Sequence, residues 1–301
     1  MTPPPISARA WLLMLLLSIL WGSSFFFIAV AVREWPPLSI VLARVSIAAV
    51  QLWLIILAVG PRPRLDRSAL VASFGMGLLN NVLPFVLIVL AQQSLPSGTA
   101  SIFNATTPLF GVLVAGAAGV ERITPPRLIG VLAGLGGVVA MAGADPLATP
   151  WPAALCMLGA TFLYALAGLW GRRFKALGMT PVQAAAGQTS ASTLMLLPLV
   201  LLLEVPPLPS LEVAGALLGL ATLCTTGGYF MYFLLLNMVG PVNMLLVTLI
   251  IPVTSFVLGA LFLNESLAPR HLLGMAGVAL GLALIDGRLM RRLPRWRNER
   301  P

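Results

Sequence analysis

The chain has 301 residues, of which 59% are hydrophobic and 9% are charged, and its formal net charge is +9. Soluble globular domains carry about 25% charged residues, so this composition excludes that class and indicates a membrane protein. The positive charge does not indicate a nucleic-acid-binding surface, because nearly all the Lys and Arg residues fall in short loops and in the C-terminal tail.

Ten apolar stretches follow one another along the chain, and each approaches or exceeds the roughly 17–25 residues needed to cross a bilayer. The first is long, bulky and aromatic and lacks a small-residue cleavage site, so we expect a retained membrane helix and not a secretory signal. The short loops leave no room for a soluble domain. The expected helices cover residues 10–32, 38–59, 68–92, 98–118, 127–144, 151–172, 181–203, 212–236, 241–262 and 269–286.

The second half of the chain repeats the first at an offset of about 144 residues. The matching positions are Asn104, Pro108, Glu121, Pro125 and Gly130 with Thr248, Pro252, Glu265, Pro269 and Gly274. An odd number of spans in each half turns the second copy upside down in the membrane. The sequence therefore predicts an all-α polytopic membrane protein whose ten transmembrane helices form two inverted five-helix repeats, residues 1–147 and 148–288, followed by a basic cytoplasmic tail, residues 289–301.

Two glycine pairs lie at the four-residue spacing that is typical of close helix contact, Gly130 with Gly134 and Gly277 with Gly281. We expect them to pack helices within the bundle, with dimerisation as the alternative.

The charges also predict the orientation in the membrane. With ten spans, fifteen of the 18 Lys and Arg residues fall on the side of the termini, only Arg33 and Arg270 fall on the other side, and Arg44 lies inside the second helix. Because positive residues concentrate in cytoplasmic loops, both termini are predicted to be cytoplasmic, in a multi-pass protein of a bacterial inner (plasma) membrane.

Several motifs resemble the drug/metabolite transporter superfamily in its ten-helix form with two EamA-type repeats. They are the run Leu20-Trp21-Gly22-Ser23-Ser24-Phe25, the membrane arginine Arg44, and the segments from Thr107-Pro108 and from Pro252 to the following glycine-rich helices. The resemblance implies a transporter and not an enzyme. The second copy departs from the first, since Gln188 stands at the position of Arg44, so contacts to substrate should be asymmetric.

Polar residues and aromatic rings at membrane depth are the best candidates for substrate binding, because polar groups in hydrocarbon need partners. The alternative is that the hydroxyl and amide groups only join helices. Helices 1, 3, 4, 6, 8 and 9 are expected to line the pathway. The candidates are Trp21, Ser24, Asn80, Asn81, Ser101, Asn104, Tyr164, Tyr229, Asn243 and Thr248.

Other residues are candidates for gating or for a structural role. Arg44 is either a site for a substrate carboxylate, an external gate, or a structural arginine bonded to helix-end carbonyls. Glu121 and Glu265 lie just ahead of helices, where a carboxylate is stabilised by free N–H groups and the helix dipole. Pro108 and Pro252 are predicted to kink repeat-equivalent helices.

The expected function is export of small organic metabolites by alternating access, most of all amino acids including aromatic ones, as in exporters of the YddG kind. No carboxylate lies at the centre of an expected span, so we expect facilitative transport. A multidrug or nucleotide-sugar carrier is the alternative within transport, and an integral-membrane lipid-modifying enzyme is the alternative from another class. Two cysteines and the lone His271 lack metal-ligand spacing, so no cofactor or metal is expected. The expected partners are a small-molecule substrate and the lipid bilayer, without nucleic acid, in a monomer or weak homodimer.

Overall fold

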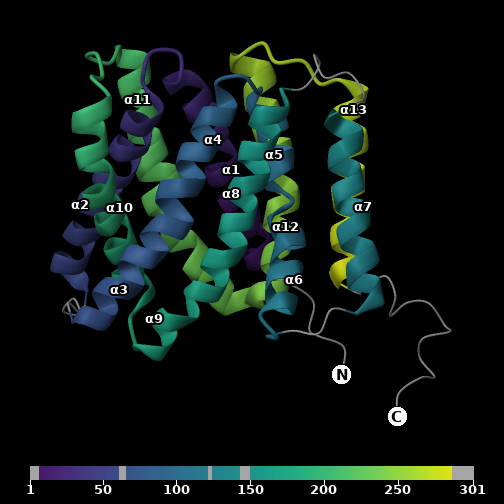
Figure 1. Cartoon of the computed structure of the whole chain (residues 1–301), viewed down its shortest axis with the longest axis horizontal. Coiled ribbons are helices and arrows are strands. Elements are labelled where there is room, and N and C mark those ends of the chain that lie inside the picture. The colour runs from purple at the N-terminus through teal and green to yellow at the C-terminus, as the bar shows by residue number, and fades with distance from the viewer. Residues whose placement is uncertain (1–6, 61–65, 121–123, 143–149, 287–301) are drawn as a thin grey trace.

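The computed structural model describes residues 7–60, 66–120, 124–142 and 150–286, and in these ranges it is a bundle of helices without strands (Figure 1). The elements are α1 (Ala8–Ala31), α2 (Pro37–Val59), α3 (Arg67–Met76), η1 (Gly77–Val82), α4 (Leu83–Gln92), α5 (Ser97–Asn104), α6 (Thr107–Ala117), α7 (Pro125–Ala142), α8 (Trp151–Trp170), α9 (Arg172–Ala176), α10 (Pro181–Leu203), α11 (Leu211–Gly219), η2 (Leu220–Gly227), α12 (Gly228–Phe262) and α13 (Pro269–Asp286).

Among the described residues, seven helical segments are long and apolar enough to cross a membrane, and three shorter apolar helices accompany them. The ten segments follow the order of the ten expected spans, so the chain is an all-α polytopic membrane protein. Two of the spans are composite. Residues Arg67–Gln92 comprise α3, η1 and α4, and Leu211–Leu236 comprises α11, η2 and the start of α12.

Two boundaries differ from the sequence-based expectation. The span expected at 98–118 is broken at Ala105 and Thr106, between α5 and α6. Pro108 has no N–H to donate to the carbonyl of Asn104, and the Thr107 hydroxyl donates to that carbonyl instead, at 2.8 Å. The repeat-equivalent Pro252 lies inside α12 without a break, so the span is interrupted near one proline and continuous across the other.

The second difference concerns α12, which continues over 35 residues where a loop was expected between 236 and 241. At 1.5 Å per residue a straight helix of that length would be about 52 Å long, well above the ~30 Å of bilayer hydrocarbon. Only its two ends, as parts of Leu211–Leu236 and Ile250–Phe262, count as separate apolar segments.

The helix pairing is the same when the two halves are exchanged. Packing of α1 on α12 corresponds to packing of α8 on α6 and α4, and packing of α1 on α11 and η2 corresponds to packing of α8 on α3 and η1. The pairs α2 with α10, α5 with α12 and α7 with α13 each map onto themselves. Every one of these contacts joins residues of the first half to residues of the second, so the interface between the halves is the core of the molecule.

The pair α7 and α13 lies at one edge of the bundle (Figure 1), and glycines bring the two helices into close contact. A Cβ on Gly137 would lie 2.7 Å from the Cα of Gly277, and a Cβ on Gly281 would lie 2.5 Å from the carbonyl oxygen of Gly130. This confirms that the glycines at close-packing spacing join helices within the bundle.

Candidate substrate-binding site

Two π-helical turns lie at repeat-equivalent places in the two halves. In η1 the Leu83 N–H donates to the carbonyl of Leu78, and in η2 the Gly228 N–H donates to that of Leu223, five residues back in each case. Such turns widen a helix locally and are frequent at functional sites. Both carry the polar residues of their spans, which are Asn80 and Asn81 in η1 and Thr222, Thr225 and Thr226 in η2.

The amides of η1 form a hydrogen-bonded cluster with residues of the second half. The Asn80 amide donates to Gln188 Oε1 at 3.0 Å and to the Tyr229 hydroxyl at 3.1 Å. Tyr229 donates to Asn81 Oδ1 at 2.8 Å, and the Asn81 amide donates to Ser192 Oγ at 3.1 Å. Asn81 lies near the middle of its 26-residue span and is fully buried. The cluster is therefore a polar centre at membrane depth, between the halves.

A buried cation lies beside this cluster. Arg44 of α2 is 7% exposed, and its Nε donates to the Thr225 hydroxyl of η2 at 2.9 Å. The guanidinium carbon lies 3.6 Å from the centre of the Phe85 ring of α4. Tyr164 and Tyr229 lie within electrostatic range of its charge. No helix-end carbonyl among the described residues accepts a hydrogen bond from Arg44.

A second set of bonds joins α2 to η2. The Gln51 amide donates to the Thr222 hydroxyl at 2.7 Å, and the Thr226 hydroxyl donates to Gln51 Oε1 at 2.8 Å. Thus both π-helical turns are bound by side chains of the second helix of the opposite repeat, η1 by Gln188 and Ser192 of α10, and η2 by α2.

The structure brings some of the predicted residues together and leaves others apart. Asn80, Asn81 and Tyr229 share the cluster, and Tyr164 lies near Arg44. Trp21 of α1 packs against α12, the helix that carries Tyr229, with its ring 5.6 Å from that of Tyr232.

Other predicted residues lie elsewhere or form only local bonds. Ser101 donates to the Gly98 carbonyl of its own helix at 2.5 Å, and Asn104 is the last residue of α5. Ser24 is buried on α1, and Thr248 is half-buried on α12. The side chain of Asn243 and residue Glu121 lie outside the described part of the chain. The polar residues of the cluster and of the bonds beside it thus lie on α2, η1, α10, η2 and the start of α12. They do not lie along α5, α6 or the second half of α12.

Six residues of the cluster and of the bonds between α2 and η2 were not among the sequence candidates. They lie on α2, α10 and η2, and they are Gln51, Gln188, Ser192, Thr222, Thr225 and Thr226. The repeat could have identified one of them as a candidate, because Gln188 occupies the position of Arg44 in the second copy. The others are single polar residues in apolar helices, and their sequence does not distinguish a shared cluster from separate helix contacts.

Carboxylates on the face predicted to be periplasmic connect the halves. Glu204, at the end of α10, accepts bonds from the Leu38 and Ser39 N–H groups at 3.1 and 2.8 Å and from the Ser39 hydroxyl at 2.7 Å. Glu34, after α1, accepts from the N–H and hydroxyl of Ser210 at 3.2 and 2.8 Å. Each carboxylate therefore caps a helix of the opposite half, α2 and α11 respectively.

Glu265 makes a third bridge of this kind. It accepts bonds from the Ser97 N–H and hydroxyl at 2.7 and 2.9 Å and from the Gly98 N–H at 3.1 Å, at the start of α5. The sequence suggested that Glu265 stabilises the helix that follows it. Instead His271 Nδ1 accepts the Ala268 N–H at the start of α13, and Glu265 caps a helix of the other repeat.

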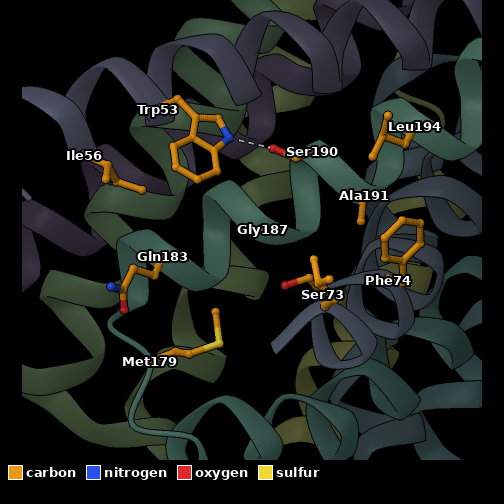
Figure 2. Close-up of a pocket in the computed structure, with 11 residues that line it drawn as sticks. Trp53, Ile56, Ser73, Phe74, Met179, Gln183, Gly187, Ser190, Ala191 and Leu194 are labelled. Atoms are coloured by element: carbon orange, nitrogen blue, oxygen red, sulfur yellow. Dashed lines mark hydrogen bonds between the residues drawn. The ribbon is translucent and has the colours of Figure 1, made fainter. Parts of the chain in front are cut away.

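A cavity of about 80 Å³ lies on the other side of the cluster, between α2, α3 and α10 (Figure 2). Figure 2 shows the Trp53 indole N–H directed at the Ser190 hydroxyl, which accepts its bond at 2.8 Å. Gln183 and Gly187 line the cavity from the half of α10 that is predicted to be cytoplasmic, and Ser73 lines it from α3. Ligand sites typically enclose ~300–1,000 Å³, so this cavity is too small for a metabolite. It marks incomplete packing at the predicted cytoplasmic end of the interface between the halves.

Comparison with known families gives the class of protein. The sequence profile of the EamA-like transporter family matches residues 8–143 and again residues 151–286. The chain belongs to the EamA-like transporter family. It is therefore a transporter of the drug/metabolite superfamily and not an enzyme.

Relatives of this family extend over most of the chain. The uncharacterized inner membrane transporter YedA of Escherichia coli K12 is 26% identical over 275 residues, which cover 89% of this chain and 88% of YedA. Protein PecM of Dickeya dadantii is 28% identical over 221 residues, 71% of this chain and 72% of PecM. These relatives agree with a multi-pass inner membrane protein and do not support the narrower YddG-like subtype.

Two further similarities are more limited. A probable terminal-alkyne amino-acid exporter of Streptantibioticus cattleyicolor is 32% identical over 147 residues, which cover 46% of each chain. A solved crystal structure with 20% sequence identity superposes with a TM-score of 0.67 and covers 95% of this chain and 99% of its own. At that identity the match supports the fold alone.

Proposed function

We propose that this transporter exports amino acids and related small amphipathic metabolites, with the substrate held at the polar cluster between the halves. The observation that carries the proposal is the bonding of Asn80 and Asn81 to Gln188, Ser192 and Tyr229. The cluster combines amide donors and acceptors with aromatic walls, at the depth where inverted-repeat transporters bind substrate. The amino-acid class is also suggested by the partial relative whose name is that of an amino-acid exporter.

The arrangement of the two halves supports alternating access. Domains 1–147 and 148–288 act as the two moving bodies in this proposal, and residues 289–301 are a cytoplasmic tail. The carboxylate caps at Glu34, Glu204 and Glu265 hold the periplasmic side closed. Opening to that side requires these caps to separate, because each joins one half to the other.

The proposed mode of transport is facilitative. A proton-coupled carrier needs a group at membrane depth that exchanges a proton, most often a carboxylate. Every Asp and Glu of this chain falls at a helix end or in a loop. Flux then follows the gradient of the substrate itself.

Uptake of a panel of radiolabelled amino acids into proteoliposomes tests the substrate class. We expect uptake of aromatic and large apolar amino acids above that of empty liposomes. Asn81→Leu should reduce this uptake at least about tenfold, because it removes three hydrogen bonds of the buried cluster. Gln93→Leu, which replaces an exposed amide at the end of α4, is the matched control and should transport normally. No uptake of any amino acid would refute the proposed substrate class.

A further inference from the structure

Arg44 is a buried cation with few hydrogen-bond partners and no ion-pair partner among the described residues. Its Nε has the Thr225 hydroxyl as acceptor and its plane faces the Phe85 ring. The two terminal amino groups, Nη1 and Nη2, donate to no side chain or carbonyl among the described residues. No described carboxylate lies within ion-pair distance of the guanidinium, and the nearest charged or titratable neighbours are Tyr164, Cys224 and Tyr229.

This state is unfavourable for a charge at membrane depth. Arg44 is the eighth residue of α2, so it lies about 10 Å along the helix from the predicted periplasmic end. Intramembrane arginines are normally paired with an acid, with backbone carbonyls or with water. An aromatic ring and one hydroxyl satisfy only part of the guanidinium, which carries five N–H donors.

The unused part of the guanidinium has the shape that recognises a carboxylate. Its two terminal amino groups form a planar fork that binds both carboxylate oxygens at once. Phe85 and Thr225 fix the plane and the rotation of the group, so the fork is held in one orientation. Its position beside Tyr229 connects it to the amide cluster, which is bonded to Tyr229 through Asn80 and Asn81.

We propose that Arg44 binds the carboxylate of the transported molecule, and that this pairing restricts the substrates to compounds with one carboxylate and an apolar or aromatic body. This inference rests on the proposed function, because it assigns a specific contact within the same site. One guanidinium balances one negative charge. A phosphate dianion would need a further cation, and no other Lys or Arg is buried among the described residues.

The halves contribute unequally to this recognition. Gln188 occupies the repeat-equivalent position. Its side chain is an uncharged amide, and its Oε1 already accepts a hydrogen bond from Asn80. The carboxylate is therefore bound on the side of Arg44, toward the predicted periplasmic face. The apolar body of the substrate then points to the aromatic residues around the cluster.

Competition in wild-type proteoliposomes tests the assignment without any variant. Uptake of labelled L-phenylalanine is measured against unlabelled L-phenylalanine, its amide and 3-phenylpropionate. We expect both carboxylates to compete and the amide to compete at least about tenfold more weakly, since a site built for one polar partner rejects an analogue that lacks it. Equal competition by acid and amide would overturn the role of Arg44 and leave the proposed function in place. Absence of uptake of every amino acid would instead refute the proposed function.

Variants then test whether Arg44 is the residue that causes the preference for the acid over the amide. Arg44→Gln should lower phenylalanine uptake at least about tenfold, and it should abolish the preference for acid over amide in whatever uptake persists. Arg44→Lys should retain the preference with weaker uptake. Arg67→Gln, an exposed arginine at the start of α3, is the matched control and should behave as wild type. Should Arg44→Gln fail to fold, protection of wild-type protein against thermal unfolding by the acid but not by the amide gives the same answer. Unchanged discrimination in a folded Arg44→Gln protein would overturn the inference.

Discussion

At the scale of single residues, we propose that the carboxylates on the predicted periplasmic face hold that side of the transporter closed. Glu204 and Glu265 each accept three hydrogen bonds from a helix start in the opposite half. Hydrogen bonds to a charged group contribute ~1.5–3 kcal/mol each. These two caps are half-buried, whereas Glu34 is exposed and contributes less.

Glu204→Gln and Glu265→Gln should therefore shift the protein toward the state that is open to the periplasm. The native thiol of Cys224 reports this change, because it is 1% exposed and adjoins Thr225 at the centre of the molecule. In a Cys156→Ser background, we expect its reaction with a membrane-impermeant thiol reagent in right-side-out vesicles to accelerate about tenfold.

Glu212→Gln is the matched control, because it breaks only the exposed ion pair with Arg33, at 3.6 Å. Exposed pairs of this kind contribute little, so the labelling rate should stay near that of the parent. Equal rates in all four proteins would show that the caps do not hold the periplasmic side closed.

At the scale of helices, the contact of α7 with α13 depends on glycines that face each other. Gly137→Ala should destabilise the protein by about 1–3 kcal/mol, the usual cost of overpacking, because its Cβ would lie 2.7 Å from the Cα of Gly277. Thermal unfolding of the detergent-purified protein measures this loss.

The neighbouring Gly136 is a stringent control. A Cβ at Gly136 would have no atom within 4 Å, so Gly136→Ala should unfold at the wild-type temperature or slightly above it. A similar loss of stability in both variants would point to helix propensity or lipid contact, and not to the α7–α13 interface.

The positions of the helices were predictable from the sequence, whereas the turns that build the site were not. Hydrophobic stretches and loop charges mark each span, so the order of the ten apolar segments agreed with expectation. A π-helical turn changes the direction of side chains without changing hydrophobicity. Adjacent residues of an ordinary α-helix point about 100° apart, and nothing in the sequence indicated that Asn80 and Asn81 both reach Tyr229.

The sequence also did not predict which residues pair across the two halves of the chain. The repeat singled out Glu265, and the family motif and its depth in a span singled out Arg44, but the partner of each lies in the other half of the chain, on α5 and η2. Periodicity describes one helix at a time. It therefore suggested that Glu265 stabilises the helix next to it in sequence, where the structure has a cap across the two repeats.

At the scale of the whole molecule, the inverted repeat predicts which loops face the outside. Single cysteines placed near Glu34, Asp145, Val205 and Glu265 should react with an impermeant reagent added outside intact cells. Cysteines near Arg64, Arg122 and Arg173 should react only after the membrane is permeabilised. The reverse pattern would contradict the orientation, and a mixture within one group would contradict the count of ten spans.

We propose that the whole molecule is a carrier that alternates between two sides and follows the substrate gradient. Counterflow tests this most directly. Proteoliposomes are loaded with unlabelled phenylalanine and diluted into buffer with a trace of labelled phenylalanine. We predict a transient accumulation of label above equilibrium, of the same size with and without an imposed pH difference, and no accumulation in net-flux controls without internal substrate. Label that only equilibrates would contradict alternating access, and accumulation driven by an inward proton gradient without internal substrate would contradict facilitative transport.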